Sequence, residues 1–287
     1  RTPDEGTTWA EYKDFLGPRI IALGKGKGPD GSDAEPGNAI KTGFPASFVT
    51  PTALWESFND TNTTDFVYYI ADEPITKGQQ IKAFSRNKAY PIYSNATKNL
   101  NKGDTLIIKD IIQARFYLGL NGSVWMTKDV LKFDKTPEWF RIANIDGMAQ
   151  TLAYTHDGNT LFVGTTSGNL YRISNLLNAH DSITADVASD KCVLSIKKLT
   201  TPWAYRFITS LYTDPHNPNR LLITLGNFGN SQYIYYTENA LDDNPTFENK
   251  QGDLPAMPIY TAIFEYSNPN NVLIGTDYCV YSTTDIT

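Results

Sequence analysis

The sequence predicts an all-β fold in which one hairpin-containing unit is repeated along the chain. Three observations lead to this prediction: a strict turn motif at residues 2–9, an aromatic anchor that recurs downstream, and a glycine before each anchor. Repeats of roughly 40–50 residues that each supply four antiparallel strands are typical of β-propeller blades. We therefore expect a β-propeller of four-stranded antiparallel blades, with six or seven blades or as part of a larger propeller.

The strict motif is Thr2-Pro3-Asp4-Glu5-Gly6-Thr7-Thr8-Trp9, which fits the pattern [ST]-x-D-x-G-x-T-W. The carboxylate of Asp4 can accept hydrogen bonds from backbone N–H groups of a turn, and Gly6 tolerates a positive φ. Thr8 completes the pattern, and Trp9 offers a broad ring to pack on a neighbouring hairpin. We expect the motif to serve folding.

The repeat is visible from an aromatic residue followed by x-[TI]-x-[DN]. From Trp125 to Tyr171 is 46 positions, from Tyr171 to Tyr235 is 64, and from Tyr235 to Tyr281 is again 46. The shortened motif ends in these four copies at Asp129, Asn175, Asn239 and Asp285. The upstream glycines are Gly119, Gly164, Gly226 and Gly275. The longer middle interval predicts an inserted surface loop within 177–203.

The first part of the chain is less regular. The interval from Asp4 to Asp129 exceeds one blade, so it holds two blades with a loop, or one blade with a small β insertion. We expect this insertion within 22–105 of a single propeller domain, and a short helical turn at Pro51–Phe58 because proline favours the first helical position. Both ends fall inside a repeat, which indicates a segment of a longer protein or a chain whose terminal strands close the ring together, and we favour the first.

Composition narrows the class of partner. The net charge is −6, and nucleic-acid binding needs clustered Lys and Arg, so we expect no nucleic acid. No apolar run reaches about 18 residues, which predicts no transmembrane segment. The Asn-, Thr- and Tyr-rich, cysteine-poor sequence is typical of an extracellular, cell-surface or periplasmic bacterial protein. Cys192 and Cys279 lie in apolar runs, which favours buried free thiols over a disulfide and leaves both alternatives open.

On these motifs the chain resembles the BNR/Asp-box repeat β-propeller superfamily, which includes sialidases, xyloglucanases and sorting-receptor domains. It is similar to exported surface propellers of the Bacteroidetes. The resemblance implies Asp-box hairpins, with Asp4, Gly6, Thr8, Trp9, Asp129 and Asp285 as the structural box residues. The chain departs from the family where Asn175 and Asn239 replace Asp and where later copies lose Gly and Trp.

Two enzyme classes in this superfamily can be weighed against the residues. A sialidase needs three arginines around a carboxylate, and the sparse arginines do not restore the family's Arg-[IL]-Pro motif. A xyloglucanase-like hydrolase needs two carboxylates about 6.5–9.5 Å apart. The weak candidates for such a pair are Asp146, Asp157, Asp214 and Asp277. Each also fits an ordinary turn role, which we favour.

Binding groups are the remaining candidates. Trp203, Tyr205 and Phe207 alternate along a predicted strand, so their rings would share one face; Trp203 and Tyr205 are the candidates for an exposed platform. Asp214, Asn217 and Asn219, like Asp157 and Asn159, offer oxygen ligands that can hold Ca²⁺, although Asx-turns explain them better. The three histidines lack zinc-ligand spacing, and no nucleotide or serine-hydrolase motif occurs, so we expect no other metal and no cofactor.

A strong fold signal without a paired catalytic constellation favours a non-catalytic propeller. We expect it to bind a protein partner or a glycan at the cell surface, as a component of a larger surface or secretion assembly. The alternative is a glycoside hydrolase of the xyloglucanase-like Asp-box type acting on a polysaccharide.

Overall fold

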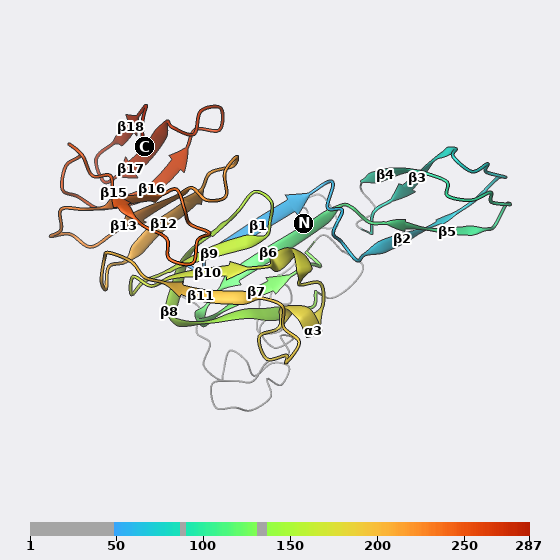
Figure 1. Cartoon of the computed structure of the whole chain (residues 1–287), viewed down its shortest axis with the longest axis horizontal. Coiled ribbons are helices and arrows are strands. Elements are labelled where there is room, and N and C mark those ends of the chain that lie inside the picture. Colours follow the sequence, from blue (N-terminus) through green and yellow to red (C-terminus); the bar gives the residue numbers. More distant parts are fainter. Residues whose placement is uncertain (1–48, 87–89, 131–136) are drawn as a thin grey trace, which may run out of the picture. The chain divides into compact units, whose positions relative to one another are not determined.

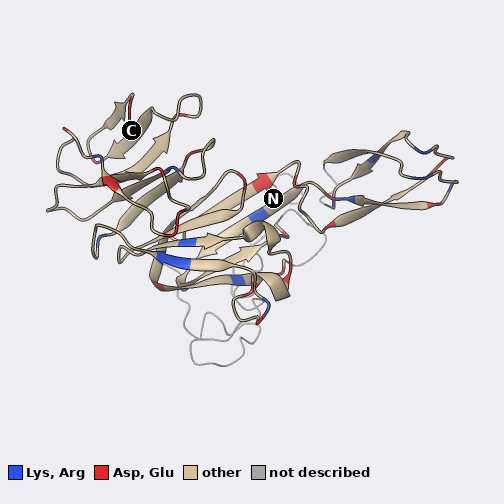
Figure 2. Ribbon diagram, in the orientation of Figure 1, with Lys and Arg blue, Asp and Glu red and all other residues tan. Residues whose placement is uncertain are grey.

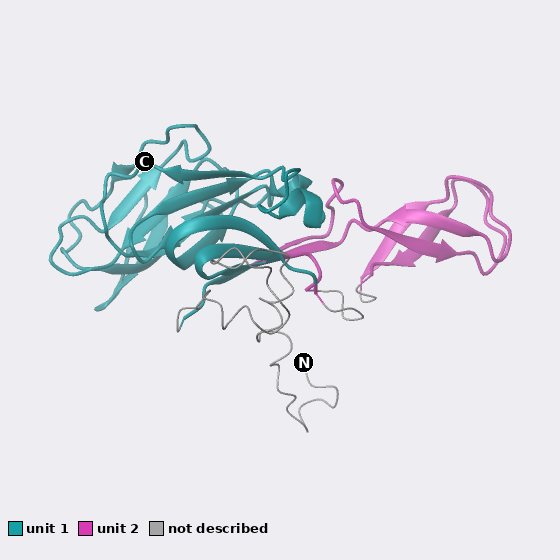
Figure 3. Cartoon of the chain, turned by 90° about the horizontal axis from the view of Figure 1, so that it is seen from below, with its two compact units in different colours: residues 1–53, 117–126, 138–287 teal, residues 54–116, 127–137 magenta. Residues whose placement is uncertain are grey.

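The computed structural model describes residues 49–86, 90–130 and 137–287, and Figure 1 shows their course. Two compact units divide the chain: unit 2 comprises residues 54–116 and 127–137, and unit 1 comprises the rest (Figure 3). The described residues consist mainly of antiparallel strands, which confirms the predicted all-β class. Asp4, Gly6, Thr8 and Trp9 lie outside the described residues.

A seven-stranded sheet holds two successive blades that share one long strand. Its strands, in spatial order, are β1 (Thr52–Ser57), β6 (Gln113–Gly119), β7 (Asn121–Thr127), β8 (Phe140–Tyr154), β9 (Thr160–Thr165), β10 (Leu170–Ser174) and β11 (Ser195–Leu199). β7 pairs with residues 140–148 of β8, and β9 pairs with residues 149–154. Blade A therefore ends, and blade B begins, within β8, and each has four antiparallel strands.

Two further sheets follow. Blade C contains β12 (Ile208–Thr213), β13 (Leu221–Leu225), β14 (Ile234–Thr237) and β15 (Glu248–Asn249). Blade D contains β16 (Ile259–Phe264), β17 (Val272–Thr276) and β18 (Val280–Thr283). Neighbouring strands within a blade follow one another in the sequence, as in the meander of a propeller blade, except in blade A, where β2 to β5 come between β1 and β6. The four aromatic anchors all fall on the third strand of a blade or next to its start: Trp125, Tyr171, Tyr235 and Tyr281.

The core of unit 1 lies between the blades. One buried cluster joins Phe162 and Leu170 of blade B to Leu211 and Ile223 of blade C. A second cluster joins Leu222 and Tyr236 of blade C to Ile259, Phe264 and Val272 of blade D. Burying each such side chain contributes about 1.5–3 kcal/mol. Successive antiparallel meanders packed face to face, four-stranded in blades A to C and three-stranded in blade D, have the architecture of a β-propeller, which agrees with the predicted fold class.

The repeated glycine makes room for a bulged strand. The first strand of blade B has a register shift at Thr151, which pairs with Gly164, and blade D repeats this with Thr261 and Gly275. A Cβ on Gly164 would lie 2.6 Å from Ile208 Cγ2 and 2.8 Å from Thr151 Cγ2. A Cβ on Gly275 would lie 2.9 Å from Thr261 Cγ2. Glycine recurs here because of close approach, and not because of a positive φ.

The shortened motif after each anchor forms a local turn. The backbone N–H of Asp129 donates to Thr127 Oγ1 at 3.1 Å. The same hydrogen bond joins Asn239 to Thr237 and Asp285 to Thr283, each at 3.2 Å. In blade C the side-chain oxygen of Asn239 also accepts from Thr237 Oγ1 at 2.8 Å and from the N–H of Thr246 at 2.9 Å, and because Asp offers the same oxygen, Asn and Asp can both occupy that position.

The turn at the end of the shortened motif forms a backbone hydrogen bond with a second turn, which connects the first and second strands of the same blade. The N–H groups of Leu176, Ala240 and Ile286, each directly after the motif, donate to the carbonyl groups of Asn159, Asn219 and Asn270 at 3.1, 2.9 and 3.1 Å. In blade B the motif ends at Asn175, which adopts the left-handed region with φ 70°. The repeat detected in the sequence is thus a repeated pair of linked turns.

Unit 2 contains strands β2 to β5, which lie between β1 and β6 in the chain, and it has its own core. β2 (Phe66–Ile70) pairs with β5 (Thr105–Lys109), and β3 (Gln80–Phe84) pairs with β4 (Pro91–Asn95). The buried residues alternate along the strands and include Val67, Ile81, Ala83, Ile92, Leu106 and Ile108. Residues 22–105, where the sequence predicts a loop or small β insertion, include β2, β3 and β4 and end at the first residue of β5.

Two local expectations differ from the structure. Residues 52–57 form strand β1, because they pair in the seven-stranded sheet, and not the expected helical turn. The loop within 177–203 is folded: α3 (Ser182–Ala185) is capped by Asp181, which accepts N–H bonds from Ile183 and Thr184, and Ala185 is fully buried. A 3₁₀ turn at Leu176–Asn178 precedes it.

Candidate functional site

The four candidate carboxylates lie on different turns or edges, and no contact joins any two of them within the described residues. Asp146 is largely exposed and accepts from Lys198 Nζ at 3.2 Å. The hydrogen bond from Lys198, together with Tyr171, holds the pKa of Asp146 below its ordinary value. A general acid of a glycosidase needs the opposite shift. Asp146 is therefore held as a carboxylate.

Asp157 and Asp277 also sit in turns. Asp157 Oδ1 accepts from Thr155 Oγ1 at 2.6 Å and from the N–H of Asn159 at 3.0 Å, in the turn between β8 and β9. Asp277 is exposed between β17 and β18. Both residues are exposed.

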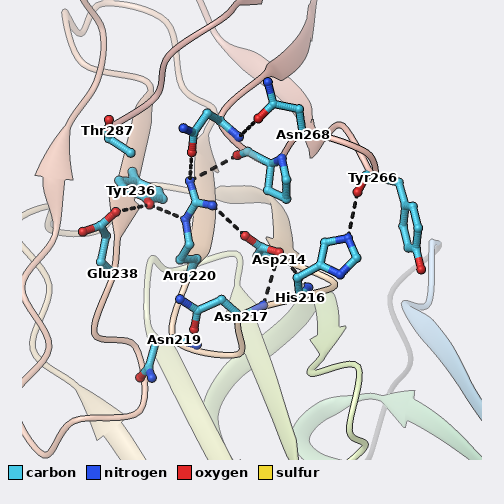
Figure 4. A network of polar contacts seen from close by, with 12 residues as sticks. Asp214, His216, Asn217, Asn219, Arg220, Tyr236, Glu238, Tyr266, Asn268 and Thr287 are labelled. Atoms are coloured by element: carbon cyan, nitrogen blue, oxygen red, sulfur yellow. Dashed lines mark hydrogen bonds and ion pairs between the residues drawn. The ribbon is translucent and has the colours of Figure 1, made fainter.

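Asp214 is the buried member of the four and forms the centre of a polar network (Figure 4). Its Oδ2 lies 2.8 Å from Arg220 Nη1, and its Oδ1 accepts from the N–H of His216 at 2.7 Å and of Asn217 at 3.3 Å. Both oxygens are thus engaged by donors. This explains why the Asp214-Pro215-His216-Asn217-Pro218 sequence forms a tight turn after β12.

Arg220 extends this network to the neighbouring blade. Its Nη2 donates to the carbonyl of Pro269 and to Asn270 Oδ1, each at 3.1 Å, in the turn between β16 and β17. Its Nε donates to Tyr236 Oη at 2.5 Å, and Tyr236 donates to Glu238 at 2.7 Å. Burial, and then the bond to Glu238, raise the pKa of Tyr236 to about 12. The phenol remains protonated and keeps its donor role at neutral pH.

His216 links the same two turns from the other side. Its Nε2 lies 2.8 Å from the carbonyl oxygen of Tyr266, and its ring packs against the Tyr266 ring with centroids 4.8 Å apart (Figure 4). Because Asp214 holds the backbone of His216, the network also positions Tyr266 in the turn between β16 and β17.

The residues of the predicted aromatic platform lie in different environments in the structure. No strand forms at residues 201–207, so the rings do not share one face. Trp203 is buried, with its ring 4.8 Å from that of Tyr235 and its indole N–H donating to the carbonyl of Gly168 at 3.1 Å. Tyr205 is 89% exposed and adopts φ 54°, a conformation that bulky residues rarely adopt. Of the two candidate binding residues, Tyr205 is exposed and Trp203 is buried.

The candidate metal ligands and cysteines have simple roles. No group of three or more His, Cys, Asp or Glu side chains is arranged to hold a metal within residues 49–86, 90–130 and 137–287. The Asp214 and Asp157 oxygens that can bind Ca²⁺ accept hydrogen bonds within their own turns. Cys192 is half-buried and Cys279 exposed, and both are free thiols, which corrects the expectation that they are buried.

An exposed apolar face of unit 2 was not predicted. Phe66, Tyr68 and Ile70 alternate on β2 and are 46%, 62% and 65% exposed, and Ile107 on β5 is 63% exposed. Tyr68 lies directly opposite Ile107, and the Phe66 and Tyr68 rings meet edge to face at 5.4 Å. The sequence feature that could have indicated this face is Phe66-Val67-Tyr68-Tyr69-Ile70, which is apolar on both faces of one strand. A half-buried strand normally alternates with polar residues.

Charge does not gather on the described ribbon: Lys and Arg are interspersed with Asp and Glu (Figure 2). None of the helices in the described part of the chain has the length and apolar character needed to cross a membrane. Searched against protein-family models and curated proteins, the sequence matches none.

Solved structures show a limited likeness. A GH74 enzyme from Niastella koreensis is 15% identical with a TM-score of 0.45, and the match covers 60% of this chain and 27% of that one. The GH74 xyloglucanase from Xanthomonas campestris is 12% identical with a TM-score of 0.42, covering 60% and 26%. The Cps50 (Swd1) β-propeller domain from Myceliophteria thermophila is 8% identical with a TM-score of 0.41, covering 77% and 58%. This chain thus spans about a quarter of the two GH74 proteins, and at these TM-scores none of their properties is transferred to it.

Proposed function

We propose that this chain is a non-catalytic β-propeller that binds a protein partner through the apolar face of unit 2. The carrying observation is the contiguous exposed row Phe66, Tyr68 and Ile70 with Ile107 across from it. Scattered exposed apolar residues are ordinary on protein surfaces, but a contiguous patch of them marks an interaction site. Aromatic anchors surrounded by aliphatic side chains are the usual centre of a protein interface.

A protein partner fits this face better than a glycan. Sugar hydroxyls need polar side chains to pair with, and the centre of the face is formed by Ile70, Ile107 and two rings. Lys109 at its corner donates to the carbonyl of Thr61 at 2.8 Å. The chemistry therefore favours an apolar protein surface with a polar rim.

The proposal includes a setting and a hairpin type. The protein is exported and acts at the cell surface or in the periplasm, within a surface or secretion assembly, as its composition favours. The blade hairpins are variants of the Asp-box, supported by the recurring Thr Oγ1 bond. The cellular setting would be contradicted if the native protein were recovered only from the cytosolic fraction of its source. The hairpin type would be contradicted if Asn239→Asp and Asn239→Ala lowered the melting temperature equally.

The partner site is tested with a matched pair of variants. Tyr68→Ser/Ile107→Ser removes the centre of the face, and Tyr93→Ser removes a ring of similar exposure from the β3–β4 sheet. A protein retained from an envelope extract is purified, and its affinity is measured for each variant. Loss of interface centres costs 2 kcal/mol or more, so we expect Kd to rise about 30-fold or more for the double variant and to stay unchanged for Tyr93→Ser. Equal affinities would refute the assignment.

The hydrolase alternative is tested directly. The native chain is incubated with xyloglucan and related polysaccharides, and new reducing ends are measured. Turnover that disappears in an Asp→Ala series through Asp146, Asp157, Asp214 and Asp277 would replace the binding proposal by the glycosidase.

A further inference from the structure

A concave pocket lies in unit 1, at strand β8 of blade B and strand β12 of blade C. It has a volume of about 350 Å³ and is lined by residues of β8, of β12 and of three turns. The lining residues are Leu152, Ala153, Tyr154, His156, Leu211, Tyr212, Thr213, Pro215 and Tyr266. The volume lies at the lower end of the range of about 300–1,000 Å³ typical of ligand sites.

The same turn of three successive blades builds the rim. His156 comes from the turn between β8 and β9, Pro215 from that between β12 and β13, and Tyr266 from that between β16 and β17. The Arg220 network described above joins two of these turns, those of Pro215 and Tyr266. Asp214 holds the backbone of His216, and His216 holds the carbonyl and ring of Tyr266. The Pro215 and Tyr266 parts of the rim are therefore held in place by polar contacts.

The walls are aromatic and held in place. Tyr212 is 37% exposed, and its ring lies 6.2 Å from that of Phe264. Tyr266 is 67% exposed and packs against His216. Thr213 Oγ1 donates to the carbonyl of Tyr154 at 2.6 Å, which joins the two strands of the floor. Rigid rings lose little conformational entropy when they bind a ligand.

The lining selects for a neutral, apolar occupant. It contains no Asp, Glu, Lys or Arg, which disfavours charged ligands. It also offers no carboxylate, carboxamide or guanidinium to pair with the many hydroxyls of a sugar. It offers tyrosine hydroxyls, which donate hydrogen bonds, beside flat apolar rings.

We propose that this pocket binds a proline-rich segment of another protein in the polyproline II conformation. Such a segment is already extended and rigid, and its backbone carbonyls have no internal partners. Pyrrolidine rings pack on the tyrosine faces, and tyrosine hydroxyls donate to the freed carbonyls. Aromatic-lined grooves recognise proline-rich segments by this combination.

The test uses oligoproline of about ten residues as the probe and a Gly-Ser peptide of equal length as its control, with binding measured by isothermal titration calorimetry. We expect the native chain to bind oligoproline and not the control. Tyr212→Ala should weaken binding at least tenfold, and Tyr278→Ala, an exposed ring outside the pocket, should not change it. An unchanged melting temperature of Tyr212→Ala verifies that this variant is folded. If Tyr212→Ala is not folded, the affinity for oligoproline is measured with Tyr212→Phe, which keeps the ring and loses the hydroxyl.

Equal binding of both peptides, or native affinity in Tyr212→Ala, would overturn the proposal, as would saturation of the pocket by a neutral oligosaccharide. The unit 2 variant Tyr68→Ser/Ile107→Ser should bind oligoproline like the native chain. Failure of this proposal is thereby separate from failure of the protein-binding face of unit 2.

Discussion

The carboxylate of Asp214 and the guanidinium of Arg220 meet at 2.8 Å within one turn, with the Asp214 side chain 1% exposed. From this pair, hydrogen bonds run to the next blade through Pro269 and Asn270 and to Tyr266 through His216. The pair thus joins two blades and helps to position Tyr266 at the rim of the pocket between β8 and β12.

We expect Asp214→Ala to lower the free energy of unfolding by about 3–5 kcal/mol, because it leaves a largely buried guanidinium without its counter-ion and two turn N–H groups without an acceptor. Urea unfolding measures the loss. Asp243→Ala is the matched control, since Asp243 pairs with Lys197 at 3.3 Å on the surface, and it should cost less than about 1 kcal/mol. Equal costs would show that burial does not govern the Asp214 pair.

Gly164→Ala tests the reason for the repeated glycine. The added Cβ would meet Ile208 and Thr151 at 2.6 and 2.8 Å, so we expect a loss of about 1–3 kcal/mol from overpacking. At Gly226 the nearest atom would be Thr209 Cγ2 at 3.2 Å, so Gly226→Ala should cost less. Thermal unfolding of both variants gives the comparison, and a larger loss at Gly226 would contradict the close-approach explanation.

Substitutions of Trp203 and of Tyr205 should have different effects on stability. Trp203→Ala removes a buried ring that packs on Tyr235 and Phe247, and we expect it to cost about 3–5 kcal/mol. Tyr205→Ala removes an exposed ring and should change stability by no more than about 0.5 kcal/mol. Tyr205→Gly should melt no earlier than the native chain, because glycine accepts φ 54° without strain. Early melting of Tyr205→Gly would mean that its ring packs in solution.

Asp181 should make the α3 turn sensitive to acid. Hydrogen bonds from the backbone and side chain of Thr184 hold its pKa below the ordinary value. Because the folded-state pKa is lowered, the stabilisation is present above the unfolded carboxyl pKa of about 3.9 and is lost as pH falls through the folded value. Amide exchange of Ile183 and Thr184 should therefore show protection that decreases on acidification. In Asp181→Asn, which keeps an accepting oxygen, this pH dependence should vanish, and its persistence would assign it to another group.

The extra residues between Tyr171 and Tyr235 show where sequence reasoning was incomplete. The spacing alone predicts an insertion, and deletion of 179–190 would be harmless if it were a loose loop. Ala179 and Ala185 are fully buried, and the N–H of Val187 donates to the carbonyl of Arg141 at 2.9 Å. A deletion there would remove core contacts, so point variants are the sound test of this segment.

The sequence by itself determined the repeated unit. Turn residues, alternating strands, the glycines and the aromatic anchors are local features, and each is set by backbone geometry within a few residues. These features identified the all-β class and the recurring aromatic anchors, which the structure places on the third strand of each blade: Trp125, Tyr171, Tyr235 and Tyr281. They also indicated turn roles for Asp157 and Asp214, where the structure places turn hydrogen bonds.

Only the tertiary structure decided which groups meet and which remain exposed. Trp203 and Tyr205 look equivalent in sequence, but one packs between blades and the other extends into solvent. Arg220 reaches Asn270, and Tyr154 and Tyr212 line one pocket, although each pair is 50 or more positions apart. Burial and contact between distant residues depend on how whole sheets pack, because the energy of a side chain is set by its neighbours in space and not by its neighbours in the chain.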